Sequence, residues 1–215
     1  MKWMTALPLC LMALAVPARA DDAKDVRAAV EGSVNSVLAV LKDKKIQGEE
    51  RKNKVMAVMD SNFDLSMMGK LTLGKTHWGE FSEDQRKDFA ELFVRTIKDT
   101  YYDKIELFSD ETVDYGTPAP AEKGKYQMLT SVVSKGSRYK IQYKLFKKEG
   151  AWKVYDAEIE GISLVKTYGQ QYDQFLAKGT PKELLAKLKE KSLSTPADLE
   201  KATKKQEDAK KEKKS

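Results

Sequence analysis

The chain has 215 residues, of which 41% are hydrophobic and 33% are charged, and its formal net charge is +6. This composition suits one folded domain and excludes a collagenous chain or one that is disordered throughout. Lysine alternates with aspartate and glutamate along almost every segment instead of gathering on one face, which argues against a nucleic-acid-binding protein.

Residues 1–20 have the pattern of a secretory signal peptide. A lysine near the start is followed by an apolar stretch over residues 6–16, and Ala18-Arg19-Ala20 matches a cleavage site of the A-x-A kind. We therefore expect a secreted mature chain that begins at Asp21. The single cysteine, Cys10, lies inside the signal, so disulfides, thiol catalysis and cysteine-ligated metals are excluded from the mature chain.

Four amphipathic helices are expected in the first half of the chain. Apolar residues recur at three- and four-residue spacings over residues 25–42, again after Gly48, and again over residues 63–73. Ser82 followed by Gln85 is a capping box that begins the fourth and strongest helix. The apolar residues of the last three helices include Val55, Met56, Met59, Met67, Met68, Leu71, Phe89, Leu92, Phe93, Ile97 and Tyr101.

An antiparallel sheet of about four strands is expected next, because the apolar period changes from about 3.6 to 2. Its strands are predicted over residues 112–115, 126–133, 138–147 and 151–159. The turn around Gly136 closes the first hairpin and sets which side chains face one another across it. The expected pairs are Met128 with Tyr143, Thr130 with Ile141, and Val132 with Tyr139.

Two registers compete for the second hairpin. A two-residue turn at Glu149-Gly150 would bring Asp156 and Glu158 onto the apolar face, where carboxylates are costly. A three-residue turn, with the glycine in the left-handed conformation, instead pairs Tyr143 with Tyr155. Burial therefore predicts the three-residue turn.

Two further helices and a charged tail follow the sheet. Ser163 is expected to cap the first helix, and Thr180-Pro181 begins the second. Residues 192–215 are rich in lysine and offer few large apolar side chains, so they form a charged tail that cannot bury a core. The predicted organisation is a signal peptide over residues 1–20, one domain over residues 21–191, and this tail.

The elements together predict an α+β domain in which helices pack on one face of a curved antiparallel sheet. Such an arrangement either fills its interior with side chains or encloses an apolar pocket for a ligand. The alternating pattern fits both outcomes, because each needs the same inward-facing residues. The methionines suit an adaptable lining, but they are also common gap-fillers of irregular cores.

Two ordered blocks of residues are similar to those of a known family. The first runs from Phe63-Asp64-Leu65 through Leu73-Gly74-Lys75 and Trp78 to Phe81-Ser82-Glu83-Asp84-Gln85-Arg86. The second is Trp152-Lys153-Val154-Tyr155-Asp156, followed by Glu160-Gly161-Ile162-Ser163-Leu164. Over roughly residues 26–191 the chain thus resembles the periplasmic phospholipid-binding proteins of the Mla type, also called MlaC-like or toluene-tolerance proteins. Many members carry arginine where this chain has Gly169.

The resemblance implies a non-catalytic periplasmic carrier that has no cofactor and holds phospholipid acyl chains as cargo in an apolar pocket. It implies transport between an outer-membrane lipoprotein complex and the MCE-domain protein of an inner-membrane ABC transporter, a system associated with outer-membrane lipid asymmetry and toluene tolerance. Transient docking on a membrane surface is expected during transfer, and no nucleic acid takes part.

The lining of the pocket is expected to come from the shared sheet face and from the helices that cover it. The candidate lipid-binding residues are Met67, Met68, Leu71, Phe89, Phe93, Met128, Val132, Ile141, Tyr143 and Tyr155. Each of these residues also suits a solid core.

Two other classes of function fit the same sequence. An enzyme would depend on Asp156 and Glu158, or on the hydroxyl of Ser163, but the carboxylates are expected on the solvent face and no histidine base is nearby in sequence. A secreted protein-binding or chaperone-like module would need the same fold but no lipid cavity. Lipid that copurifies with the protein would distinguish the carrier from such a module.

Overall fold

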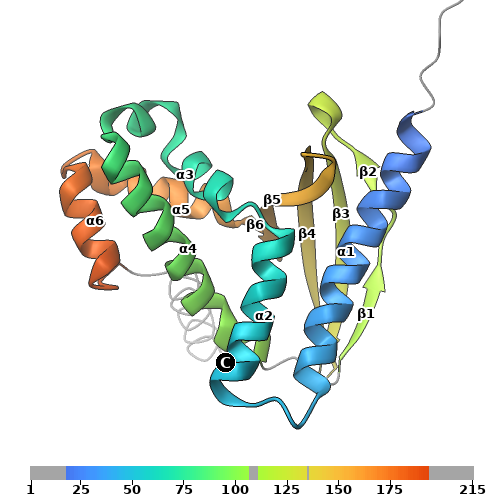
Figure 1. The fold of residues 1–215 in the computed structure, drawn as a ribbon. Helices are drawn as coiled ribbons and strands as arrows, with labels where there is room; N and C mark the ends of the chain where they lie inside the picture. Colours follow the sequence, from blue (N-terminus) through green and yellow to red (C-terminus); the bar gives the residue numbers. More distant parts are fainter. Residues whose placement is uncertain (1–17, 107–110, 135, 194–215) are drawn as a thin grey trace, which may run out of the picture.

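The computed structural model describes residues 18–106, 111–134 and 136–193, which form an α+β fold (Figure 1). Its helices are α1 (Ala18–Lys42), α2 (Gly48–Asn62), α3 (Leu65–Glu80), α4 (Glu83–Glu106), α5 (Leu164–Leu176) and α6 (Pro181–Lys189). Its strands are β1 (Thr112–Tyr115), β2 (Ala119–Pro120), β3 (Tyr126–Ser134), β4 (Ser137–Lys148), β5 (Ala151–Ile159) and β6 (Ile162–Ser163), with a 3₁₀ turn at Glu122–Gly124. Most of the predicted signal peptide and of the charged tail lies outside the described residues.

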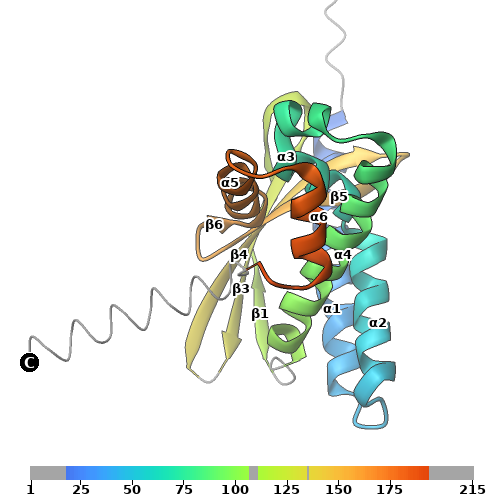
Figure 2. The same ribbon diagram turned by 90° about the vertical axis from the view of Figure 1, so that its left-hand side faces the viewer.

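The strands form one open antiparallel sheet in the order β1-β3-β4-β5-β6, and β2 pairs with β3. The four expected strands are confirmed, and the two additional strands have only two residues each. The first hairpin has the predicted register, with Met128 opposite Tyr143 and Thr130 opposite Ile141. Viewed from the side, α1, α2 and α4 lie on one side of strands β1, β3 and β4 (Figure 2).

The second hairpin differs from the prediction. Glu149 and Gly150 both have positive φ, at 51° and 84°, as a two-residue hairpin turn of type I′ requires. One extra residue, Tyr155, then bulges from β5 and shifts the register, so that Tyr143 pairs with Ala157. The predicted three-residue turn is wrong because the bulge inside the strand restores the apolar pairing that the turn was expected to provide.

The predicted helix starts at residues 82 and 180 are confirmed by their caps. The backbone N–H of Ser82 donates to the side chain of Gln85 (2.9 Å), and the Gln85 N–H donates back to the Ser82 hydroxyl (3.2 Å). Thr180 and Glu183 form the same reciprocal pair at the start of α6. Among the described helices, none is long and apolar enough to cross a membrane.

Buried apolar side chains form two clusters. The larger one, here called the helical cluster, joins α2 to α6 and includes Met68, Phe89, Phe93, Tyr168 and Tyr172. The smaller one, here called the sheet cluster, packs the first half of α1 against the sheet and contains Val26, Val30, Tyr126, Met128, Leu145, Trp152 and Val154. Figure 1 shows α3 to α6 on one side of the molecule, α1 with the sheet on the other, and α2 between them. Phe63 packs against both clusters.

The connection between α2 and α3 fixes the position of Phe63. Its backbone N–H closes the end of α2 by donating to the carbonyl of Met59 (2.8 Å). The next residue, Asp64, donates its own N–H to the carbonyl of Val154 on β5 (2.9 Å) and accepts from the N–H of Met67 with its carboxylate (2.9 Å). The chain is therefore tied to the sheet at the point where α3 begins, and Phe63 is held over β5.

Helices α3 and α5 approach each other closely at Gly169. A Cβ atom on this residue would lie 3.1 Å from the carbonyl oxygen of Thr72 on α3. Because that oxygen belongs to a helix backbone, it has little freedom to move away. The glycine that departs from the family pattern is thus a packing residue in this chain.

Candidate functional site

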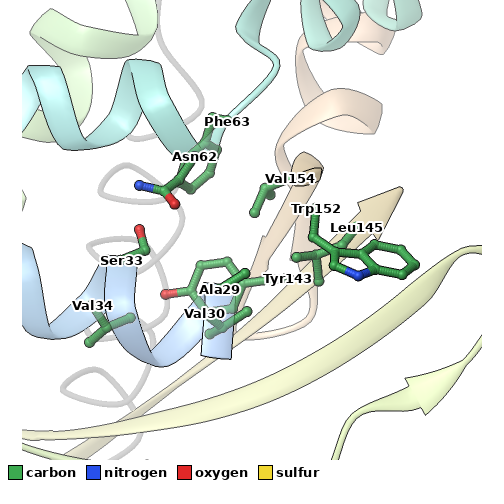
Figure 3. Close-up of a pocket in the computed structure, with 10 residues that line it drawn as sticks. All are labelled: Ala29, Val30, Ser33, Val34, Asn62, Phe63, Tyr143, Leu145, Trp152 and Val154. Atoms are coloured by element: carbon green, nitrogen blue, oxygen red, sulfur yellow. The ribbon is translucent and has the colours of Figure 1, made fainter. Parts of the chain in front are cut away.

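A narrow slot lies between α1, the end of α2 and strands β4 and β5 (Figure 3). It is lined by Ala29, Val30, Ser33 and Val34 from α1, by Asn62 and Phe63, and by Tyr143, Leu145, Trp152 and Val154 from the sheet. The slot therefore opens on the sheet cluster beside Phe63, the side chain that lies between the two clusters.

The lining is mostly apolar, and its uncharged polar groups are those of Ser33, Asn62, Tyr143 and the indole N–H of Trp152. Figure 3 shows the Ser33 hydroxyl, the Asn62 amide and the Tyr143 hydroxyl toward the α1 side of the slot, and Leu145 and Val154 toward the sheet. None of the described lining residues carries a formal charge. Such a lining suits a ligand that is apolar along most of its length and polar at one end.

Tyr143 stays protonated at neutral pH. Burial raises the pKa of its hydroxyl to about 12, although a hydrogen bond with the side chain of Thr130 acts in the opposite direction. The ring meets that of Phe63 edge-on, with 6.4 Å between centroids. Tyr143 thus adds a neutral hydroxyl to the polar side of the slot.

The slot is too small for an acyl chain as it stands. Its volume is about 10 Å³, enough for about one water molecule. The slot is therefore not itself the enclosed apolar pocket that the sequence predicts, and the side chains of Trp152 and Met128 in the sheet cluster are buried at 7% and 1% exposure.

The candidate residues on β3 and β4 lie on the expected face of the sheet. Tyr143 lines the slot, and Met128, directly opposite on β3, is buried in the sheet cluster. Val132 and Ile141 are partly buried farther along the same two strands. Their contact with a lipid stays a prediction.

The candidates on the helices divide into two groups. Met68, Phe89 and Phe93 have no exposed surface and belong to the helical cluster, apart from the slot. Met67 and Leu71, by contrast, are 36% and 42% exposed. The expectation that these two point inward is wrong, since α3 packs its other side against the core and turns theirs to solvent.

Tyr155 lies on the opposite face of the sheet from the one predicted. Its ring meets Phe146 at a centroid distance of 5.9 Å, and the ammonium of Lys125 lies 4.3 Å from its ring centroid. The bulge in β5 is the cause, because it turns Tyr155 to the same side as Asp156 instead of alternating with it.

The residues that sequence reasoning missed come chiefly from α1. Val30 and Val34 belong to the apolar stripe that predicted this helix, but nothing in the stripe indicates which element it covers. Ser33 and Asn62 carry no local signal at all. Phe63 belongs to the first family block, which was its only indication.

The carboxylates of the enzyme hypothesis serve the fold. Asp156 is 4% exposed, so its expected place on the solvent face is wrong. Its carboxylate accepts from the hydroxyl of Ser163 (2.7 Å) and from the N–H of Val165 (3.1 Å), and it pairs with Lys144 (3.0 Å). Glu158 pairs with the same lysine. Burial disfavours the charged lysine, but these hydrogen bonds outweigh it and raise the pKa of Lys144.

Ser163 has the predicted capping role, since its oxygen accepts from the N–H of Lys166 (3.1 Å) at the start of α5. Within the described ranges, no three histidine, cysteine, aspartate or glutamate side chains are grouped so that they could hold a metal ion.

Three comparisons place the chain among known proteins. A sequence model of the family described as MlaC protein matches residues 31–190. The toluene tolerance protein ttg2D of Pseudomonas putida is 25% identical over 177 residues, which cover 79% of this chain and 77% of that protein. A phospholipid-binding protein from Ralstonia solanacearum, solved in complex with a phospholipid, has a similar structure with a TM-score of 0.68 and 26% sequence identity. The match covers 77% of this chain and 96% of that one.

Proposed function

The chain belongs to the MlaC family, and we propose that it is a periplasmic carrier that shuttles phospholipid between the outer and inner membranes. The observation that carries the proposal is the likeness to a protein whose structure contains a phospholipid. An outer-membrane lipoprotein complex and the MCE-domain protein of an inner-membrane ABC transporter are the partners that fit this role. The function is binding and transfer, with lipid as cargo and no cofactor.

Acyl chains need a protein interior to cross an aqueous gap. Each CH₂ group moved from water to an apolar environment gains about 0.8 kcal/mol, so long chains leave a bilayer for water only very slowly. In this chain the sheet cluster supplies the apolar environment, and the slot is where it meets the surface. The uncharged polar side of the slot suits the glycerol and ester groups that join acyl chains to a headgroup.

Loading requires the slot to widen, because it holds about one water molecule. Displacement of Phe63 would enlarge the slot toward the helical cluster, since this side chain is only partly buried and packs against both clusters. Moving it would bring Met68 and Phe93 within reach of an acyl chain. The candidate residues of the helical cluster then become part of the lining.

Native mass spectrometry tests the proposal directly. Residues 21–215, purified without detergent, are expected to carry a stoichiometric lipid adduct and to take lipid from vesicles when stripped. A protein that stays at its apo mass after incubation with vesicles would refute the carrier function. That result would favour the alternative, a secreted protein-binding module of the same fold.

Two neighbouring alanines on α1 provide a matched pair of variants for locating the cargo. Ala29→Trp places an indole in the slot, whereas Ala28→Trp places it on the exposed side of the same helix turn. Overpacking costs about 1–3 kcal/mol, so both variants are first checked for native circular dichroism. Ala29→Trp is expected to reduce lipid loading and Ala28→Trp to leave it unchanged. Equal loading by the two would show that lipid does not use the slot.

A further inference from the structure

Helix α3 exposes two large apolar side chains side by side. Met67 and Leu71 are one helical turn apart, which places them on the same face, and they are 36% and 42% exposed. Lys70 lies between them in sequence and is also exposed, as is Lys75 just beyond the kink at Gly74. The exposed side of α3 therefore combines the apolar side chains of Met67 and Leu71 with the positive charge of Lys70, and Lys75 follows past the kink.

Lys70 and Lys75 are both exposed, so an external anion can reach them. Among the described residues, no carboxylate forms an ion pair with Lys70 or Lys75. On neighbouring helices, by contrast, Lys52 pairs with Asp99 and Lys98 pairs with Asp60. The charge of an unpaired surface lysine is not neutralised by a neighbouring carboxylate, and its attraction for a phosphate weakens only as salt screens it.

An aromatic side chain continues the face. The ammonium of Lys70 lies 5.4 Å from the ring centroid of Trp78, and the guanidinium of Arg86 lies 5.5 Å from it. The indole is only partly buried. Tryptophan held at a surface beside cations is typical of the interface between membrane and water, because its ring has an apolar body and a polar N–H.

We propose that this face of α3 docks the protein on an anionic phospholipid bilayer. Met67 and Leu71 enter the interfacial region, while Lys70 and Lys75 contact lipid phosphates. The unpaired positive charge beside the apolar side chains favours a bilayer over a protein partner, since an anionic surface satisfies both features at once. The proposal goes beyond cargo binding, because docking does not require a lipid inside the protein.

The proposed docking face lies close to the slot in the chain. Asp64 caps α3, and the residue before it, Phe63, lines the slot. The docking face thus begins within four residues of the side chain that separates the two clusters. A bilayer seated on α3 would lie next to the part of the chain that has to move for loading.

Cosedimentation with vesicles tests the docking face. The full mature chain is incubated with phosphatidylcholine vesicles that contain or lack phosphatidylglycerol. We expect binding to the anionic vesicles that falls with salt, and the double variant Met67→Ser with Leu71→Ser should bind about tenfold more weakly. Lys70→Gln with Lys75→Gln should weaken binding by about the same factor on anionic vesicles only.

The matched control removes two equally exposed apolar side chains from other elements, by Leu129→Ser with Ile162→Ser, at 40% and 41% exposure. This control should bind vesicles as the wild type does. All variants replace exposed side chains, so unchanged melting temperatures and unchanged lipid adducts confirm that fold and cargo binding are intact. Wild-type protein that ignores anionic vesicles, or α3 variants that bind as well as the control, would overturn the proposal.

Discussion

Asp156 joins the end of β5 to the start of α5, and its replacement by alanine tests how much this junction stabilises the fold. The side chain is only 6% exposed. Alanine would leave the hydroxyl of Ser163 and the N–H of Val165 without their acceptor, while Lys144 would keep Glu158 as a partner.

The expected loss follows from these contacts. A hydrogen bond to a charged group contributes about 1.5–3 kcal/mol, and breaking a buried ion pair costs about 3–5 kcal/mol. Because the lysine retains one partner, we expect Asp156→Ala to lower the free energy of unfolding by about 3–5 kcal/mol. For a domain of this size that corresponds to a fall in melting temperature of roughly 6–20 °C.

Glu158→Ala is the matched control, because Glu158 pairs with the same lysine from the same face. Its side chain is 20% exposed, and alanine would remove its ion pair with Lys144, so the expected cost is about 1 kcal/mol or less. Thermal unfolding followed by circular dichroism measures both variants. If Asp156→Ala melts at the same temperature as Glu158→Ala, the reasoning about the buried junction is refuted.

Two further predictions concern packing and pH. Gly32→Ala on α1 adds a methyl group to open space and should stabilise the protein by up to about 1 kcal/mol. Gly169→Ala on α5 should destabilise it, because the new Cβ would lie 3.1 Å from a backbone carbonyl oxygen. Melting temperatures of the two variants that shift in the same direction would contradict this prediction. His77 bonds Glu80 and Asp173, both at 2.8 Å, and the Glu80 bond is the chief cause of its raised pKa, against opposing desolvation. The stabilisation by His77 should therefore be complete below its unfolded pKa of about 6.5 and be lost as the pH rises through its folded pKa. The difference in free energy of unfolding between wild type and His77→Gln should shrink across that range. A difference that stays constant with pH would exclude the effect.

Much of the fold was predictable because it depends on local pattern. The capping pairs at Ser82 and Thr180, the strand positions and the first hairpin register all follow from residues close together in sequence. The second hairpin was not predictable in this way. In a regular hairpin the turn length fixes the strand pairing, but the bulge at Tyr155 uncouples the two in this chain.

The candidate site was less predictable, because its walls come from three segments distant in sequence. An apolar stripe indicates that a side chain is covered, but it does not indicate by what. Met67 and Phe89 lie on stripes of the same kind, yet one is 36% exposed and the other is fully buried, because exposure depends on which helix packs alongside.

The sequence by itself determined the α+β class, the helix caps, the order of the main strands and, through two ordered blocks, the family. The tertiary structure alone decided that Phe63 lies between two clusters, that Asp156 is buried against α5, and that α3 presents an apolar and basic face to solvent. The physical reason is the range of the interactions. Helix caps, hairpin turns and apolar periodicity depend on near neighbours in the chain, whereas burial, ion pairing and the contacts between distant segments depend on elements that meet only after the chain has folded.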